Sequence, residues 1–291
     1  MKQTTVRKNI KISGVSPYSG NPSAITIKPA AVDTGIVFLY QGKYVPVSVS
    51  NIPEHNGLHT TALSLNGIKI ETTEHLLSVL SGLGINNAII EVEGSGQIPV
   101  TEGVALDYVE PILKVGITTY DKEQPVYRIE RENYYQEGDS FAILKPCDGD
   151  YLEIEICIKF PYPISSQCLD YRTDSNKFVN ELAWARSFLR SDLNALHNLG
   201  GKNISTWDRA RMTIKTLPDD PKLSPIICYR GGKYVSKPIK PDEPVRHKMM
   251  DFIGDFSIVG KPVYGNLKIN WPGHAFNCNL ARWFVNEVTK N

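Results

Sequence analysis

Apolar residues recur with a helical period in several parts of this chain. Leu76, Leu80 and Leu83 form one stripe after Glu74, so a helix is predicted to begin near Glu74 and to end before Gly84. The same periodicity predicts further helices over residues 106–115, 180–196, 244–256 and 275–288.

Short apolar runs bounded by turn residues predict strands between these helices. They cover residues 31–40, 44–49, 87–92, 126–131, 141–145 and 151–160. Residues 118–125 are polar, have no period and end in proline, which predicts a linker. Strands come first and helices late on both sides of it. We therefore expect an α+β protein with two similar domains, residues 1–120 and 125–291, each a β-sheet layered against α-helices.

Charge and hydropathy narrow the class of protein. The 291 residues include 32 basic and 31 acidic side chains with no long basic run, which argues against nucleic-acid binding and favours a small-molecule substrate. Residues 1–13 lack the apolar core of a secretory signal, and no apolar run approaches the roughly 20 residues of a membrane helix. We expect a cytoplasmic monomer without a transmembrane segment.

The cysteines form no C-x-x-C pair, and their number is odd. This pattern argues against a cysteine metal or redox site and predicts buried free thiols in a reducing compartment. The five residues are Cys147, Cys157, Cys168, Cys228 and Cys278.

A candidate metal site begins in the predicted helix 244–256. His247, Asp251 and Asp255 are spaced four residues apart, so Asp251 lies about 40° and Asp255 about 80° around the helix from His247. Apolar residues such as Phe252 occupy the other side. The alternative is a solvated face that carries these polar residues by chance.

A second candidate element is the pair Glu74-His75 at the predicted start of a helix. The alternative is an ordinary helix start, where a carboxylate is favoured by the helix dipole. That dipole also disfavours imidazolium and should keep His75 neutral. His75, His247 and Asp251 together would supply the three ligands of a catalytic zinc site, leaving a position for water. This combination predicts metal-assisted hydrolysis, with Glu74 beside the site as a proton acceptor.

The remaining histidines carry weaker signals. His274 lies in a Gly-Pro turn just before a predicted helix, a position typical of a surface or capping residue. His55, His59 and His197 lie in a turn-rich loop or near a helix end, and we assign them no functional role.

Several motifs together resemble the UDP-3-O-acyl-N-acetylglucosamine deacetylases, a family of zinc enzymes of lipid A synthesis. The similarity extends from about residue 10 to the C-terminus and is weakest between about 198 and 243. The motifs are Thr-Glu-His-Leu-Leu at 73–77, Gly-Leu-Gly-Ile-Asn-Asn at 82–87, Ile-Pro at 98–99 with Glu-Gly at 102–103, Ala-Arg-Ser-Phe at 185–188, Arg-His-Lys-Met-Met-Asp-Phe-Ile-Gly-Asp at 246–255 and Gly-His-Ala-Phe-Asn at 273–277.

The resemblance implies two domains with the active site between them, and it implies roles for individual residues. His75, His247 and Asp251 correspond to the zinc ligands, although iron(II) could take the same place. Glu74 corresponds to the general base. His274 corresponds to the electrostatic stabiliser and acid, and Asp255 to the carboxylate that orients it. Ser187 corresponds to a hydroxyl near the oxyanion.

The implied substrate is an acylated nucleotide sugar. Lys248, Phe188 and Tyr18 correspond to its binding residues, but Tyr18 replaces a histidine of the family and Trp271 stands where a basic residue is common. Val104 departs from the family as well. A divergent deacetylase for another N-acetylated compound is therefore one alternative. Another is a catalytically silent module that keeps the metal only for folding.

Overall fold

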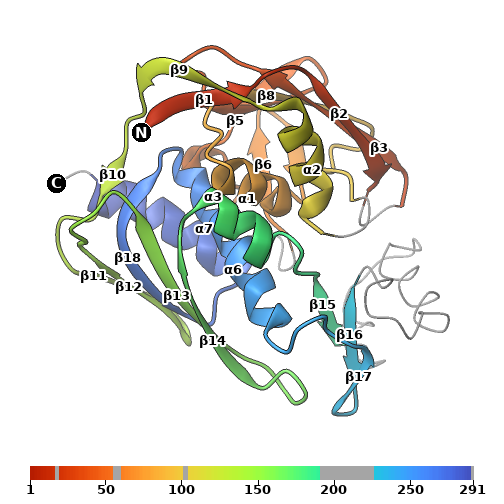
Figure 1. Cartoon of the computed structure of the whole chain (residues 1–291), viewed down its shortest axis with the longest axis vertical. Coiled ribbons are helices and arrows are strands. Elements are labelled where there is room, and N and C mark those ends of the chain that lie inside the picture. Colours follow the sequence, from red (N-terminus) through yellow and green to blue (C-terminus); the bar gives the residue numbers. More distant parts are fainter. Residues whose placement is uncertain (17–19, 55–59, 101–103, 191–225, 290–291) are drawn as a thin grey trace.

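The computed structural model describes residues 1–16, 20–54, 60–100, 104–190 and 226–289. Helices lie between two β-sheets, one built from residues before 94 and one from residues after 126 (Figure 1). The protein thus has the α+β architecture that the alternation of strands and helices predicts. No helix in these ranges is both long and apolar enough to span a bilayer.

The N-terminal sheet has five strands in the order β2-β3-β8-β4-β5. β4 pairs in parallel with the central strand β8, and the other neighbours are antiparallel. The elements of this part are β1 (Lys2–Val6), β2 (Ile10–Val15), β3 (Pro22–Pro29), β4 (Ile36–Tyr40), β5 (Lys43–Pro46), η1 (Val49–Asn51), β6 (Ala62–Leu65), β7 (Ile68–Glu71), α1 (Glu74–Gly82), β8 (Ala88–Glu93), α2 (Leu106–Val115) and β9 (Ile117–Glu123).

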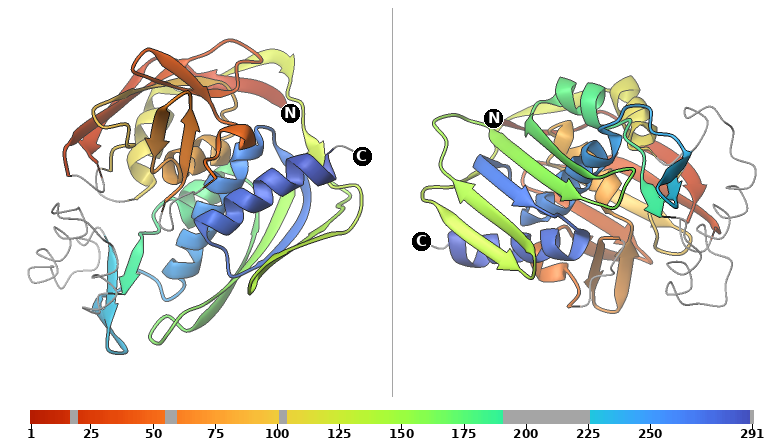
Figure 2. Two further views of the ribbon diagram at one scale, coloured as in Figure 1. Left: turned by 180° about the vertical axis from the view of Figure 1, so that it is seen from behind. Right: turned by 90° about the horizontal axis from the view of Figure 1, so that it is seen from below.

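The C-terminal sheet has the order β11-β12-β18-β13-β14, and β10 also pairs with β18. A smaller sheet, β15-β16-β17, lies at one end of the molecule (Figures 1 and 2). The elements are β10 (Tyr127–Arg128), β11 (Asn133–Glu137), β12 (Ser140–Lys145), β13 (Leu152–Lys159), β14 (Ser166–Arg172), α3 (Ser175–Lys177), η2 (Phe178–Leu182), β15 (Phe188–Arg190), β16 (Ile227–Arg230), β17 (Lys233–Ser236), α6 (Glu243–Phe256), η4 (Ser257–Val259), β18 (Val263–Asn270), α7 (His274–Trp283) and η5 (Phe284–Val288).

The close packing of α1 against α6 joins the two parts, and Gly254 makes it possible. A Cβ atom on Gly254 would overlap the carbonyl oxygen of Glu74 and lie 3.0 Å from the backbone nitrogen of Ser78. Only a residue without a side chain lets the two backbones approach this closely. The first turn of α1, which carries Glu74 and His75, therefore lies directly on α6.

Two predicted elements are wrong. The predicted linker 118–125 is largely strand β9, which pairs with β1 from Lys2 to Val6, and its polar character reflects its half-exposed position. The predicted helix 180–196 ends early, since residues 178–182 form a π-helical turn and Phe188–Arg190 is a strand paired with β16. Residues 191–196 lie outside the described ranges.

The prediction for the cysteines is also wrong in part. Cys157 and Cys168 lie directly opposite each other on β13 and β14 and form a disulfide. Cys228 and Cys278 are buried thiols outside any disulfide, as expected, whereas Cys147 also forms no disulfide but is only half-buried. The pairing follows from the antiparallel register, which brings the two side chains to the same face of adjacent strands.

Candidate active site

Three potential metal ligands converge where α1 meets α6. His75 Nε2 lies 3.4 Å from Asp251 Oδ1, and His247 Nε2 lies 3.3 Å from the same oxygen. One ligand atom from each residue falls within 4.8 Å of the others, which is the one such group in the part of the chain described. Asp251 is 1% exposed and His247 4% exposed, so the polar stripe of α6 is buried and is not a solvated face.

The state of the donor atoms fits a bound cation. Asp251 Oδ1 is buried and has no hydrogen-bond partner among the described residues, and a buried unpaired carboxylate oxygen is costly unless an ion compensates it. His247 Nδ1 lies 3.2 Å from the carbonyl oxygen of Ala185 and can donate to it, which leaves the Nε2 lone pair directed at the group. Two imidazole nitrogens and one carboxylate oxygen are typical ligands of a divalent transition metal.

The two imidazoles are in different electrostatic environments. Burial lowers the pKa of His247 to about 4, which keeps it neutral and able to ligate. Burial would also lower the pKa of His75. The nearby Asp251 carboxylate has the opposite effect, which is larger, so the pKa of His75 is raised. The Asp251 carboxylate thus acts on His75 in the direction opposite to the one expected from the helix dipole.

Glu74 is held next to the ligand group by two threonines. Its carboxylate accepts hydrogen bonds from Thr60 Oγ1 at 3.1 Å and from the backbone nitrogen of Thr61 at 2.9 Å. It is 4% exposed, and burial raises its pKa. Thr73 is the N-cap residue of α1, but its hydroxyl makes no capping hydrogen bond and instead donates to the Thr61 carbonyl oxygen at 3.2 Å.

His274 begins α7 and is paired with Asp255 of α6. His274 Nδ1 lies 2.9 Å from Asp255 Oδ2, and the other ring nitrogen, Nε2, lies 3.8 Å from Asp251 Oδ2 at the ligand group. Burial would lower the pKa of His274, but the carboxylates of Asp255 and Asp251 raise it to about 9. This histidine is 8% exposed, so it is not the surface residue that its turn favours.

Thr61 connects the two proton-transfer candidates and was not predicted. Its hydroxyl donates to Asp255 Oδ1 at 2.6 Å, and its backbone nitrogen donates to Glu74. Asn277 Nδ2 donates to Asp255 Oδ2 at 2.9 Å and holds the other side of that carboxylate. No periodicity marked Thr61, whereas Asn277 lay in the family motif around His274 and could have been found there.

The predicted catalytic residue Ser187 and two of the predicted substrate residues, Lys248 and Phe188, lie around the ligand group. Ser187 Oγ lies 3.3 Å from His247 Nε2, Lys248 Nζ lies 2.9 Å from Asp251 Oδ2, and the Phe188 ring packs edge-on against His247 at 6.2 Å. The segment 185–188 therefore reaches the ligand group.

A buried ion pair holds this segment in place. Arg186 donates from its backbone nitrogen and from Nε to Glu243 Oε1 at 3.1 and 2.7 Å, and the side chains of both residues are almost fully buried. Since Glu243 is the first residue of α6, the pair ties Ser187 to the helix that carries His247.

An aromatic wall extends from the site and was not predicted as such. Phe160 packs edge-on against Phe188 at 5.0 Å and stacks with Trp271 at 6.0 Å, and Trp271 is 42% exposed. Tyr18 and the histidines His55, His59 and His197 lie outside the described residues.

Comparison with known proteins decides the family. Residues 3–286 match the family of UDP-3-O-acyl N-acetylglycosamine deacetylases (LpxC). This chain belongs to that family. It is 33% identical to the UDP-3-O-acyl-N-acetylglucosamine deacetylase of Thermodesulfovibrio yellowstonii, a match that covers 97% of this chain and 91% of that protein.

Other deacetylases of the same name show the same degree of similarity. The protein of Nitratidesulfovibrio vulgaris is 35% identical over 97% of this chain and 87% of its own length. That of Histophilus somni is 31% identical over 97% of this chain and 89% of its own length. The match covers almost the whole chain in each case, so both the N-terminal and the C-terminal parts of the site fall within the aligned region.

Proposed function

We propose that this chain is a zinc-dependent N-deacetylase that removes the acetyl group of UDP-3-O-acyl-N-acetylglucosamine in lipid A biosynthesis. One observation carries the proposal: Asp251 Oδ1 is buried, meets no hydrogen-bond criterion with any described residue, and faces the Nε2 atoms of His75 and His247. Three protein ligands with a further position for water are typical of catalytic zinc. The same donors would accept iron(II).

The bound ion would polarise the amide carbonyl and lower the pKa of water to about 7. Glu74 is the proposed general base, because it lies beside the ligand group without belonging to it and Thr60 and Thr61 fix its orientation. It accepts a proton as the water oxygen bonds to the carbonyl carbon. The products are acetate and a free amine.

The His274–Asp255 pair is the proposed electrostatic stabiliser and acid. Because its pKa is raised to about 9, His274 is cationic at neutral pH, which favours the negative charge that develops on the carbonyl oxygen. It then donates a proton to the leaving nitrogen as the C–N bond breaks. Asp255 orients the ring through Nδ1, so that Nε2 faces the reacting group. The Ser187 hydroxyl is a further proposed donor near the oxyanion.

Lys248, Phe188 and Tyr18 are the proposed substrate contacts. The aromatic wall formed by Phe160, Phe188 and Trp271 supports an apolar or ring-shaped part of the substrate beside the ligand group. We further propose that the two large sheets mark two domains that meet at this site, and that the protein acts as a monomer in the cytoplasm.

A different N-acetylated substrate is the second candidate. It is favoured by Trp271, whose half-exposed aromatic side chain stands where a basic residue is common in the family. Trp271 offers no positive charge that could bind the diphosphate of a nucleotide at that position.

Acetate release tests both candidates. The purified zinc-loaded protein is incubated with UDP-3-O-acyl-N-acetylglucosamine, with UDP-N-acetylglucosamine and with N-acetylglucosamine, and acetate and free amine are quantified. We expect equal amounts of both products from the acylated nucleotide sugar, loss of turnover on chelation and recovery on adding zinc. No release at stoichiometric zinc would favour another substrate, and unchanged release after full chelation would contradict the metal assignment.

A further inference from the structure

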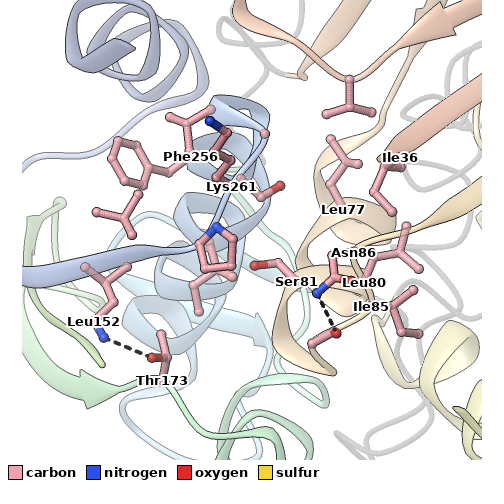
Figure 3. Close-up of a pocket in the computed structure, with 18 of the residues that line it drawn as sticks. Ile36, Leu77, Leu80, Ser81, Ile85, Asn86, Leu152, Thr173, Phe256 and Lys261 are labelled. Atoms are coloured by element: carbon pink, nitrogen blue, oxygen red, sulfur yellow. Dashed lines mark hydrogen bonds between the residues drawn. The ribbon is translucent and has the colours of Figure 1, made fainter. Parts of the chain in front are cut away.

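A cavity of about 280 Å³ opens between the two parts of the protein, and its lining includes none of the residues of the candidate active site. Figure 3 shows the side chains around it. On α6 it is bounded by Phe252, Ile253 and Phe256, which lie on the opposite face of the helix from His247. It is therefore a separate site on the far side of α6.

The lining of the cavity is mainly aliphatic and comes from both parts of the chain. Leu77 and Leu80 of α1 and Ile36 of β4 form one wall, and Leu152 of β13 and Phe256 of α6 belong to the other (Figure 3). A cavity of 150 Å³ with such a lining binds a ligand of benzene size, and sites for larger organic ligands begin at roughly 300 Å³. The size and lining suit an apolar chain of moderate length.

One cation on the rim of the cavity lacks a counter-charge. Lys261 is exposed, and its ammonium group lies 4.7 Å from the centre of the Tyr127 ring, but no carboxylate pairs with it among the described residues. The other charged groups of the lining are compensated, because Asp150 pairs with Arg128 and the Met1 amino group lies 3.5 Å from Glu123. The rim therefore favours an anionic group.

We propose that this cavity binds an unbranched aliphatic carboxylate, with its chain between α1 and α6 and its carboxylate at Lys261. The cavity has nearly twice the volume of the 150 Å³ cavity that holds the six carbons of benzene, so it suits a chain of about eight to ten carbons. Each methylene group that enters raises the affinity by up to about fourfold. The proposal does not depend on deacetylation, since the ligand undergoes no reaction.

Equilibrium binding of octanoate to the full chain tests this assignment. Octanoate and decanoate should bind at one site per chain, acetate should not bind, and octanoate should perturb the NMR methyl signals of Ile85 and Ile253, which line the cavity. 1-Octanol should bind about fivefold more weakly than octanoate, because it lacks the charge that pairs with Lys261.

Two variants and a matched control distinguish octanoate binding in this cavity from binding at any acyl-binding surface of the active site. Ser81→Trp fills the cavity from an exposed position of α1 and should abolish octanoate binding while acetate release from the deacetylase substrate stays unchanged. Lys261→Gln should weaken binding about fivefold, whereas Lys233→Gln, at an exposed lysine outside the lining, should not change it. Full octanoate binding by Ser81→Trp, or none by the unmodified chain, would overturn the proposal, and equal binding of octanol and octanoate would overturn the role of Lys261.

Discussion

The helices α1 and α6 build two contrasting regions from the same pair of elements. At the first turn of α1, buried charges are held by hydrogen bonds from Thr60 and Thr61, and Gly254 brings the backbones into contact. Further along α1, Leu77 and Leu80 line an aliphatic cavity. The polar region has fixed directional contacts, while the apolar region leaves unfilled space. Precise geometry is thus concentrated where the chemistry requires it.

The largest expected effect comes from removing the proposed base. Glu74→Gln keeps the size of the side chain but cannot accept the proton, so turnover should fall by roughly 10²- to 10⁴-fold. Zinc content, measured by atomic absorption, should stay near one ion per chain because Glu74 is outside the ligand group. His247→Ala is the contrasting variant and should lose the ion. Near-normal acetate release by Glu74→Gln would exclude this residue as the base.

The second expected effect concerns the contact between the helices. Gly254→Ala places a methyl group against the Glu74 backbone and should lower the free energy of unfolding by about 3 kcal/mol. Urea denaturation measures this loss, and zinc affinity should weaken in the variant that still folds. Gly273→Ala is the matched control, since a Cβ atom there meets no atom within 4 Å. Equal stability of the two variants would show that α1 and α6 can move apart at this point and accommodate the added methyl group.

A smaller effect is expected from the bridge between the base and the acid. Thr61→Val removes the hydroxyl that bonds Asp255 but keeps the backbone donor to Glu74, so kcat should fall about tenfold with little change in KM. Thr61→Ser restores the hydroxyl and should recover most of the rate. A valine variant with unchanged kcat would mean that Asn277 alone suffices to hold Asp255.

The smallest effect belongs to the apolar region. Ser81→Leu adds aliphatic surface at the rim of the cavity and should raise the free energy of unfolding by about 0.5 kcal/mol. Turnover should not change, because no residue of the active site lines the cavity. A loss of turnover would show that the two regions are coupled through α1.

The sequence predicted helices better than strands, since it missed even the hairpins β2–β3 and β6–β7, whose strands are neighbours in the chain. The helix 106–115 has the predicted bounds, and α1 and α6 begin within one residue of theirs. β9 and β15 were missed because their partners, β1 and β16, lie far away in the chain and no local pattern marks them. An edge strand with polar residues cannot be distinguished from a linker without its partner.

In the site, too, the residues marked by a local sequence pattern were predicted, whereas those whose role depends on contacts between distant segments were missed. The ligand group was predictable because His247 and Asp251 share a helical face and the Glu74-His75 pair resembles a family motif. The role of Thr61 depends on a loop that folds back onto both α1 and α6, so it emerges only in three dimensions. The Cys157–Cys168 disulfide was missed for a related reason, since it requires the register of β13 against β14.

The ligand group also has a consequence for the biogenesis of the protein. Its nitrogen and oxygen donors come from helices that are far apart in the chain, so an unfinished polypeptide that has made only α1 contains His75 alone of the three residues of the ligand group. High-affinity uptake must wait until α6 has been synthesised and has packed against α1. The cation would then bind only to molecules in which α1 and α6 have packed correctly, and it would stabilise that folded state.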